Sequence, residues 1–100
     1  MPALLEDEGR FLALLEAQHS FPGRFEFKVI HKSIPGLSES IVAAIVARTG
    51  FPPSETPPSL RSSSAARYVS MSVEFQVRTS RDVLAVYKVL SELENVISYL

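Results

Sequence analysis

The stretch that decides the fold is RYVSMSVEFQVRT, residues 67–79, because its apolar and polar side chains alternate without a break. Read as a strand, it carries Val69, Met71, Val73, Phe75 and Val77 on one side and Tyr68, Ser70, Ser72, Glu74, Gln76 and Arg78 on the other. A long strand that is polar on one side only is typical of the middle of an antiparallel sheet with one covered face. The stretch therefore predicts a sheet with one buried face and one open face.

Five flanking segments complete the expected sheet and its two covering helices. Residues 24–30 alternate like the central stretch, and residues 55–62 and 95–100 are expected as further strands, the first at an edge because prolines cannot donate to a ladder on both sides. Apolar residues at helical spacing predict helices that begin after residue 33 and after residue 79. The closing strand has apolar side chains on both faces, and we expect Ile97 and Tyr99 on the open one.

The helix ends carry recognisable signals. Ser33 is expected to cap the first covering helix, and Gly50 is expected to end it in the left-handed conformation. Thr79 and Asp82 have the spacing of a capping box at the start of the second. Before the sheet, residues 1–20 predict an amphipathic helix whose apolar stripe is Leu4, Leu5, Phe11, Leu12 and Leu15.

This order predicts the fold class and the domain organisation. Two strand-helix-strand crossovers joined by a hairpin favour an α+β, ferredoxin-like βαββαβ sandwich: a four-stranded antiparallel sheet with two helices on one face, plus the N-terminal helix. Residues 21–100 are expected to form that domain. The N-terminal helix, a second sheet or water remain as alternatives for what meets the open face.

Composition narrows the function classes. The 100 residues carry a net charge of −1 with singly scattered basic residues, so no global field attracts nucleic acid. There is no cysteine for disulfides, thiolate metal sites or nucleophiles, and three acidic residues in the first ten are unlike a secretion signal. We expect a cytoplasmic protein with no cofactor, no metal, no membrane contact and no nucleic-acid partner.

Few side chains suggest chemistry. His19 and His31 lack partners at metal-ligand spacing and are expected to be solvent-facing loop histidines. The turn with Ser62, Ser63 and Ser64, flanked by Arg61 and Arg67, predicts either a small anion-binding nest or simply a polar hairpin. Lys28, expected on the open face, is interpreted as a partner of Glu74 or as a ligand for a carboxylate.

Several motifs resemble the YbeD-like family of small bacterial proteins of unknown function. They are FPGRFEFKVI at residues 21–30, LRSSSAARYVS at residues 60–70 and Val86-Tyr87 in the closing helix. The resemblance covers about residues 21–100 and implies a ferredoxin-like fold similar to the amino-acid-sensing ACT regulatory domains. Family members usually have glycine at the positions of His31 and Ala66. The resemblance implies no particular activity.

These observations favour a non-enzymatic regulatory or protein-interaction module that acts through its open sheet face or its sheet edge. The alternative is a small-metabolite sensor in which Lys28, Ser63, Ser64 and Tyr68 bind an amino acid or organic anion. RNA binding is disfavoured because Tyr68 is the one aromatic residue predicted on the open side of the central strands. A homodimer through the sheet face or the N-terminal helix is a separate expectation.

Overall fold

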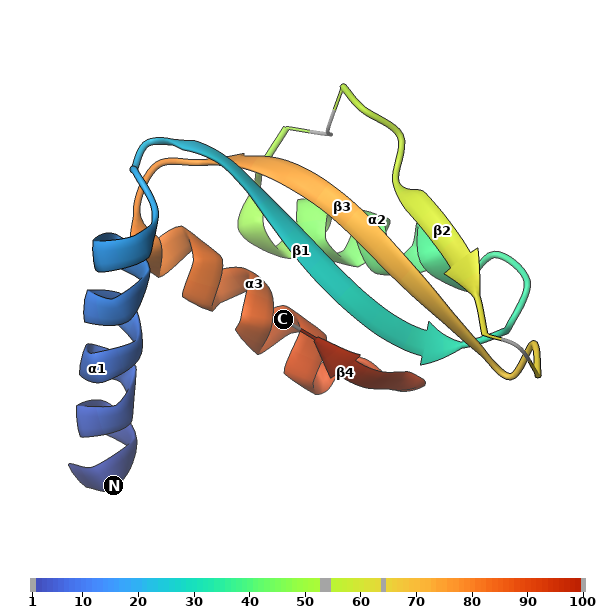
Figure 1. Cartoon of the computed structure of the whole chain (residues 1–100), viewed down its shortest axis with the longest axis horizontal. Coiled ribbons are helices and arrows are strands. Elements are labelled where there is room, and N and C mark those ends of the chain that lie inside the picture. Colours follow the sequence, from blue (N-terminus) through green and yellow to red (C-terminus); the bar gives the residue numbers. More distant parts are fainter. Residues whose placement is uncertain (1, 53–54, 64, 100) are drawn as a thin grey trace.

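The helices and strands follow one another in the predicted order (Figure 1). The computed structural model describes residues 2–52, 55–63 and 65–99, and the side chains of residues 2–6 lie outside that description. The elements are α1 (Pro2–Gln18), β1 (Gly23–Lys32), α2 (Leu37–Thr49), β2 (Ser59–Ser62), β3 (Tyr68–Val77), α3 (Ser80–Glu92) and β4 (Val96–Tyr99).

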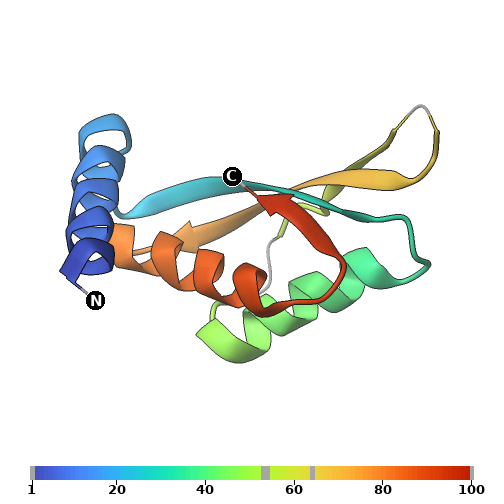
Figure 2. The ribbon, with the colours of Figure 1, turned by 90° about the horizontal axis from the view of Figure 1, so that it is seen from below.

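The strands form one antiparallel sheet in the order β2-β3-β1-β4. The two long strands, β1 and β3, are its centre, and their register pairs Phe25 with Phe75 and Lys28 with Ser72. Both α2 and α3 lie on the same side of the sheet (Figure 2). The predicted ferredoxin-like α+β sandwich, with the 67–79 stretch in its middle, is confirmed.

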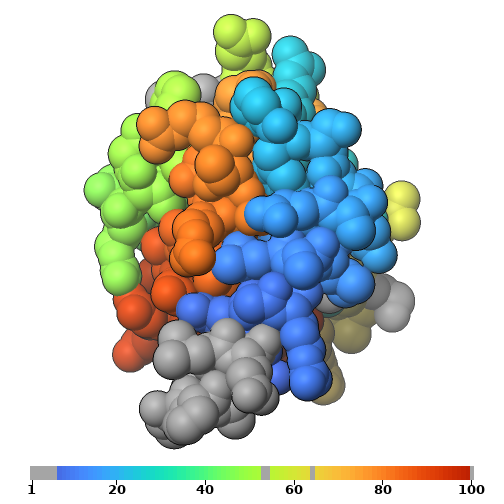
Figure 3. Space-filling model, turned by 90° about the vertical axis from the view of Figure 1, so that its left-hand side faces the viewer, coloured from blue at the N-terminus to red at the C-terminus, as the bar shows by residue number. Residues whose placement is uncertain are grey.

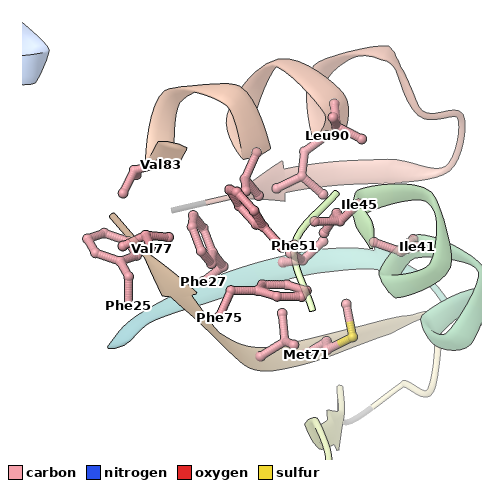
Figure 4. Close-up of a cluster of buried hydrophobic side chains, with 14 of the residues drawn as sticks. Phe25, Phe27, Ile41, Ile45, Phe51, Met71, Phe75, Val77, Val83 and Leu90 are labelled. Atoms are coloured by element: carbon pink, nitrogen blue, oxygen red, sulfur yellow. The ribbon is translucent and has the colours of Figure 1, made fainter. Parts of the chain in front are cut away.

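The hydrophobic core lies between the sheet and the two covering helices (Figure 4). Alternation along β1 and β3 points one row of side chains into it, and Phe27 and Phe75 meet there with ring centroids 6.1 Å apart. The helices contribute Ile41, Ile45, Val83, Val86 and Leu90. Each such buried side chain stabilises the fold by about 1.5–3 kcal/mol relative to exposure. The predicted inward row of β3 is buried from Met71 to Val77.

The N-terminal helix α1 packs beside α3 at one end of the sheet and does not lie across the open face (Figures 2 and 3). Leu15 belongs to the main core, and the ring of Phe11 lies 5.5 Å from that of Tyr87. The Ser80 hydroxyl donates a hydrogen bond of 2.8 Å to Glu16 Oε1. The predicted stripe also included Leu4 and Leu5, whose side chains lie outside the described part of the chain.

The helix ends differ from the prediction at two of three places. The first covering helix begins at Leu37 and its N-cap is Gly36, at φ 78°, so the prediction that Ser33 caps it was wrong. Thr79 is the N-cap of α3 but makes no side-chain cap bond: the Asp82 amide donates to the Thr79 carbonyl at 3.1 Å, and the Asp82 carboxylate accepts from the Arg78 amide at 2.8 Å. Gly50 ends α2 as expected, at φ 75°, with its amide donating to the Val46 carbonyl.

The bounds of β1 and β2 differ from the prediction. β1 continues to Lys32, where we had expected a loop from residue 31. β2 begins only at Ser59 and not at residue 55, because Pro57 and Pro58 have no amide hydrogen for the ladder.

The prediction that Tyr99 faces the open side was wrong. Tyr99 pairs with Val29 of β1, packs on the core and lies 5.5 Å from the ring of Tyr87. The reason is a register shift in the β1–β4 ladder, which places an extra residue in β4 and lets both Val96 and Tyr99 pack inward. Ile97 remains 53% exposed, as expected for the open side.

Candidate functional site

His31 is the most deeply buried polar side chain among the described residues, with 1% of its surface exposed. The prediction of a solvent-facing loop histidine was therefore wrong for this residue. Phe25, Phe27 and Val29 point inward, and the same alternation continues to His31 because β1 is two residues longer than expected. This alternation is visible in the sequence, and continuing it to residue 31 would have predicted that His31 is buried.

The His31 ring joins β1 to the first turn of α2. Its Nδ1 lies 2.7 Å from the Lys32 carbonyl oxygen, and because a carbonyl only accepts, Nδ1 carries the proton. Its Nε2 lies 2.8 Å from Ser38 Oγ and accepts from the hydroxyl. A serine hydroxyl bonded to an oriented histidine is also the arrangement of a nucleophile and its base. Here the His31 ring is 1% exposed and Ser38 is 9% exposed, and we name the pair the polar clip because it ties β1 to α2.

His19, by contrast, is exposed as expected. It follows the end of α1 and its ring lies 4.9 Å from that of Phe25 at the end of the core.

Ser38 of the clip also lines an apolar groove between α2 and β2. This edge groove has a volume of about 530 Å³ and is lined by Ser38, Glu39, Val42, Ala43, Val46, Pro57, Pro58 and Leu60. Leu60 pairs with Met71, so its side chain points to the helix side of the sheet, yet it is 53% exposed. Pro57 and Pro58, which precede the short edge strand, form part of the wall of this groove.

The outer edge of β2 offers hydrogen-bonding groups to a further strand. The Ser63 amide donates to the Tyr68 carbonyl at 2.9 Å, which makes this a hydrogen-bonded pair at the end of the ladder. Such pairs alternate along an antiparallel ladder, so Arg61 bonds to β3, whereas the amides and carbonyls of Leu60 and Ser62 point outward. In the described part of the chain, β2 has β3 as its neighbour on one side and no strand on the other.

The predicted ligand residues occupy different places. Lys28 lies on the open face opposite Ser72. Tyr68, which is 43% exposed, lies on the same face opposite Lys32, four residues further along β1. The Ser63 hydroxyl accepts from the Tyr68 amide at 3.2 Å. Ser64 lies outside the described residues. The register thus brings Ser63 and Tyr68 together and sets Lys28 about 13 Å along the sheet from the Tyr68–Lys32 pair.

Two further cations lie on the same half of this face: Lys32, which was not predicted as a site residue, and Arg61, which was expected only as a flank of the serine turn. Lys32 follows Lys28 and Ile30 along the outward row of β1, and Arg61 lies opposite Ser70. The even-numbered parity of β1 indicated Lys32, whereas only the β2–β3 register places Arg61 on this face. Lys28 and Glu74 do not form the predicted ion pair: the pairs within the described residues are Arg48–Glu92, Arg78–Asp82 and Lys88–Glu8.

The fold and its surfaces define a small ferredoxin-like α+β protein with an open sheet face and an apolar edge groove. Residues 16–100 match the sequence profile of a family described as "Protein of unknown function (DUF493)". A UPF0250 protein of Shewanella piezotolerans (strain WP3 / JCM 13877) is 32% identical over 76 residues, which are 76% of this chain and 83% of that protein. The chain belongs to this family, which includes YbeD, so the predicted resemblance is confirmed.

Within the residues described, no helix is both long and apolar enough to cross a membrane.

Proposed function

We propose that this protein is a non-enzymatic regulatory module that docks an extended peptide segment of a protein partner on the free edge of β2. The observation that carries this proposal is the combination of outward-pointing backbone groups at Leu60 and Ser62 with the apolar edge groove beside them. Addition of a strand to an exposed sheet edge takes its affinity from the main chain and its specificity from side-chain pockets.

The groove and the charges beside it specify what the peptide would look like. Side chains that point to the helix side of the sheet meet Val42, Val46 and Leu60 and should be apolar. Side chains that point to the open face meet Arg61 and should be acidic, because Arg61 is in none of the ion pairs within the described residues. An extended segment that alternates apolar and acidic residues fits both requirements.

A library of phage-displayed random nonapeptides, selected on the whole chain, tests the proposal. We expect the enriched peptides to alternate apolar and acidic residues and to lose binding to the Leu60→Lys variant. The control is Leu14→Lys, which places the same charge at a residue of α1 that is 58% exposed. Amide chemical shifts should change at Leu60 and Ser62 when an enriched peptide is added. Enriched peptides that bind Leu60→Lys as well as the parent, or no enrichment over that variant, would refute the docking site.

The homodimer stays a prediction. Light scattering is expected to give twice the chain mass of 11.0 kDa, and a mass of 11.0 kDa at high protein concentration would contradict it.

A further inference from the structure

The charges of the open face are segregated along its strands. At one end the register places Glu26 opposite Glu74 and Arg24 opposite Gln76. From Lys28 toward the β2–β3 turn, the outward positions carry cations, hydroxyls, Tyr68 and an isoleucine, and no carboxylate. We name this part the cationic half-face and define it by Lys28, Lys32, Arg61, Tyr68, Ser70 and Ser72.

The three cations of the half-face surround two serines. Ser72 lies opposite Lys28, and Ser70 lies opposite Arg61 on the next strand. With strands ~4.8 Å apart and a rise of ~3.3 Å per residue, the Cα atoms of Lys28, Lys32 and Arg61 form a triangle with sides of about 12–13 Å. Long side chains from its corners can converge on one ligand above the serines, whose hydroxyls supply additional donors.

No acidic side chain neutralises this triangle within the described residues. None of its three cations takes part in the ion pairs found there. The neighbouring carboxylates, Glu26 and Glu74, lie one outward position beyond Lys28 and opposite each other. A surface of one sign raises the local concentration of counter-ions of the other sign.

We propose that the cationic half-face binds a small polyanion with at least two phosphate or carboxylate groups, at a site that shares Arg61 with the peptide-docking edge and otherwise lies on β1 and β3. Arg61 suits a bidentate contact to one oxyanion, and Lys28 and Lys32 act as point charges on the others. Three cations carry more positive charge than one phosphate neutralises, so two linked anionic groups fit better than one. This site keeps Lys28 and Tyr68 of the predicted ligand set, and Lys32 and Arg61 complete it.

Titration of the whole chain with pyrophosphate, followed by backbone amide chemical shifts, tests the proposal. We expect saturable shifts at Tyr68, Ser70 and Ser72, and weaker binding of inorganic phosphate. Arg61→Gln and Lys32→Gln should each weaken pyrophosphate binding about tenfold, the effect of losing one charge-assisted hydrogen bond. Arg24→Gln, which removes the same charge at the acidic end of the same face, should leave binding unchanged.

Other results would overturn the inference. Non-saturable shifts, or an Arg24→Gln variant as weak as Arg61→Gln, would indicate general charge screening instead of a site. Citrate that competes with pyrophosphate at the same amides would support a polyanion site that also accepts carboxylates. A ten-nucleotide single-stranded RNA that binds the same residues more tightly than pyrophosphate would replace the small ligand by nucleic acid and refute the proposal.

Discussion

The polar clip between His31 and Ser38 makes a prediction whose size can be worked out from the structure. The change is Ser38→Ala, which removes the hydroxyl that donates to His31 Nε2 at 2.8 Å. The ring is 1% exposed, so water cannot readily replace that donor. An unsatisfied buried polar group costs about 1–3 kcal/mol, and the better helix propensity of alanine returns about 0.5 kcal/mol. The free energy of unfolding should therefore fall by about 1–2 kcal/mol.

Urea unfolding of the whole chain, followed by circular dichroism, measures this loss. In thermal unfolding it corresponds to a decrease in Tm of about 5–15 °C for a domain of this size. The matched control is Ser40→Ala, two residues along the same helix, where the serine is exposed and its loss should be neutral or slightly stabilising.

A double variant separates the clip from simple packing. In Ser38→Ala combined with His31→Leu both partners become apolar, and most of the lost stability should return. The Lys32 carbonyl then loses the hydrogen bond from His31 Nδ1, but Lys32 is exposed and water can replace that bond. If Ser38→Ala proved as harmless as Ser40→Ala, or if the double variant were less stable than Ser38→Ala, the clip would not stabilise the fold as argued.

Three further predictions concern the turn, Tyr87 and the proposed non-enzymatic role. Ala66 has a φ of 55°, a conformation that favours glycine. Ala66→Gly should therefore stabilise the protein by about 0.5 kcal/mol in urea unfolding, whereas Ala65→Gly should not. Equal effects of the two changes would contradict backbone strain at Ala66. Burial, and then the charge of nearby Tyr99, raise the pKa of Tyr87 above its ordinary 10.0, so the stability that this group contributes is complete below pH 10 and is lost as the pH rises through the folded-state pKa. Tyr87→Phe should flatten this alkaline loss in unfolding experiments at pH 9–12, and an unchanged slope would refute the assignment. A fluorophosphonate probe should not label Ser38, as judged by mass spectrometry, and labelling that stops on His31→Leu would contradict a non-enzymatic module.

Much of the fold could be predicted from side-chain periodicity. The alternation of β3 identified its inward row, and the same pattern in β1 made the two strands the centre of the sheet. The signal is reliable because a period of two is a property of the strand itself and needs no knowledge of its neighbours. At His31 the alternation was present in the sequence, but the predicted strand stopped at residue 30, whereas β1 continues to Lys32.

The candidate sites depended on information that periodicity does not contain. Parity placed Lys28 and Tyr68 on the open face, but their distance apart follows from the register between β1 and β3. Arg61 joins them only because the short β2 pairs with the outer half of β3.

The sequence by itself determined which side chains of the central strands face the core and which face outward, and with them the ferredoxin-like order of elements. Only the tertiary structure decided that Ser38 completes the hydrogen bonding of His31, that an extra residue in β4 turns Tyr99 inward, and that a groove remains beside Leu60. The physical reason is range: side-chain direction is set by the local backbone, whereas register, bulges and grooves arise where segments distant in the chain pack together.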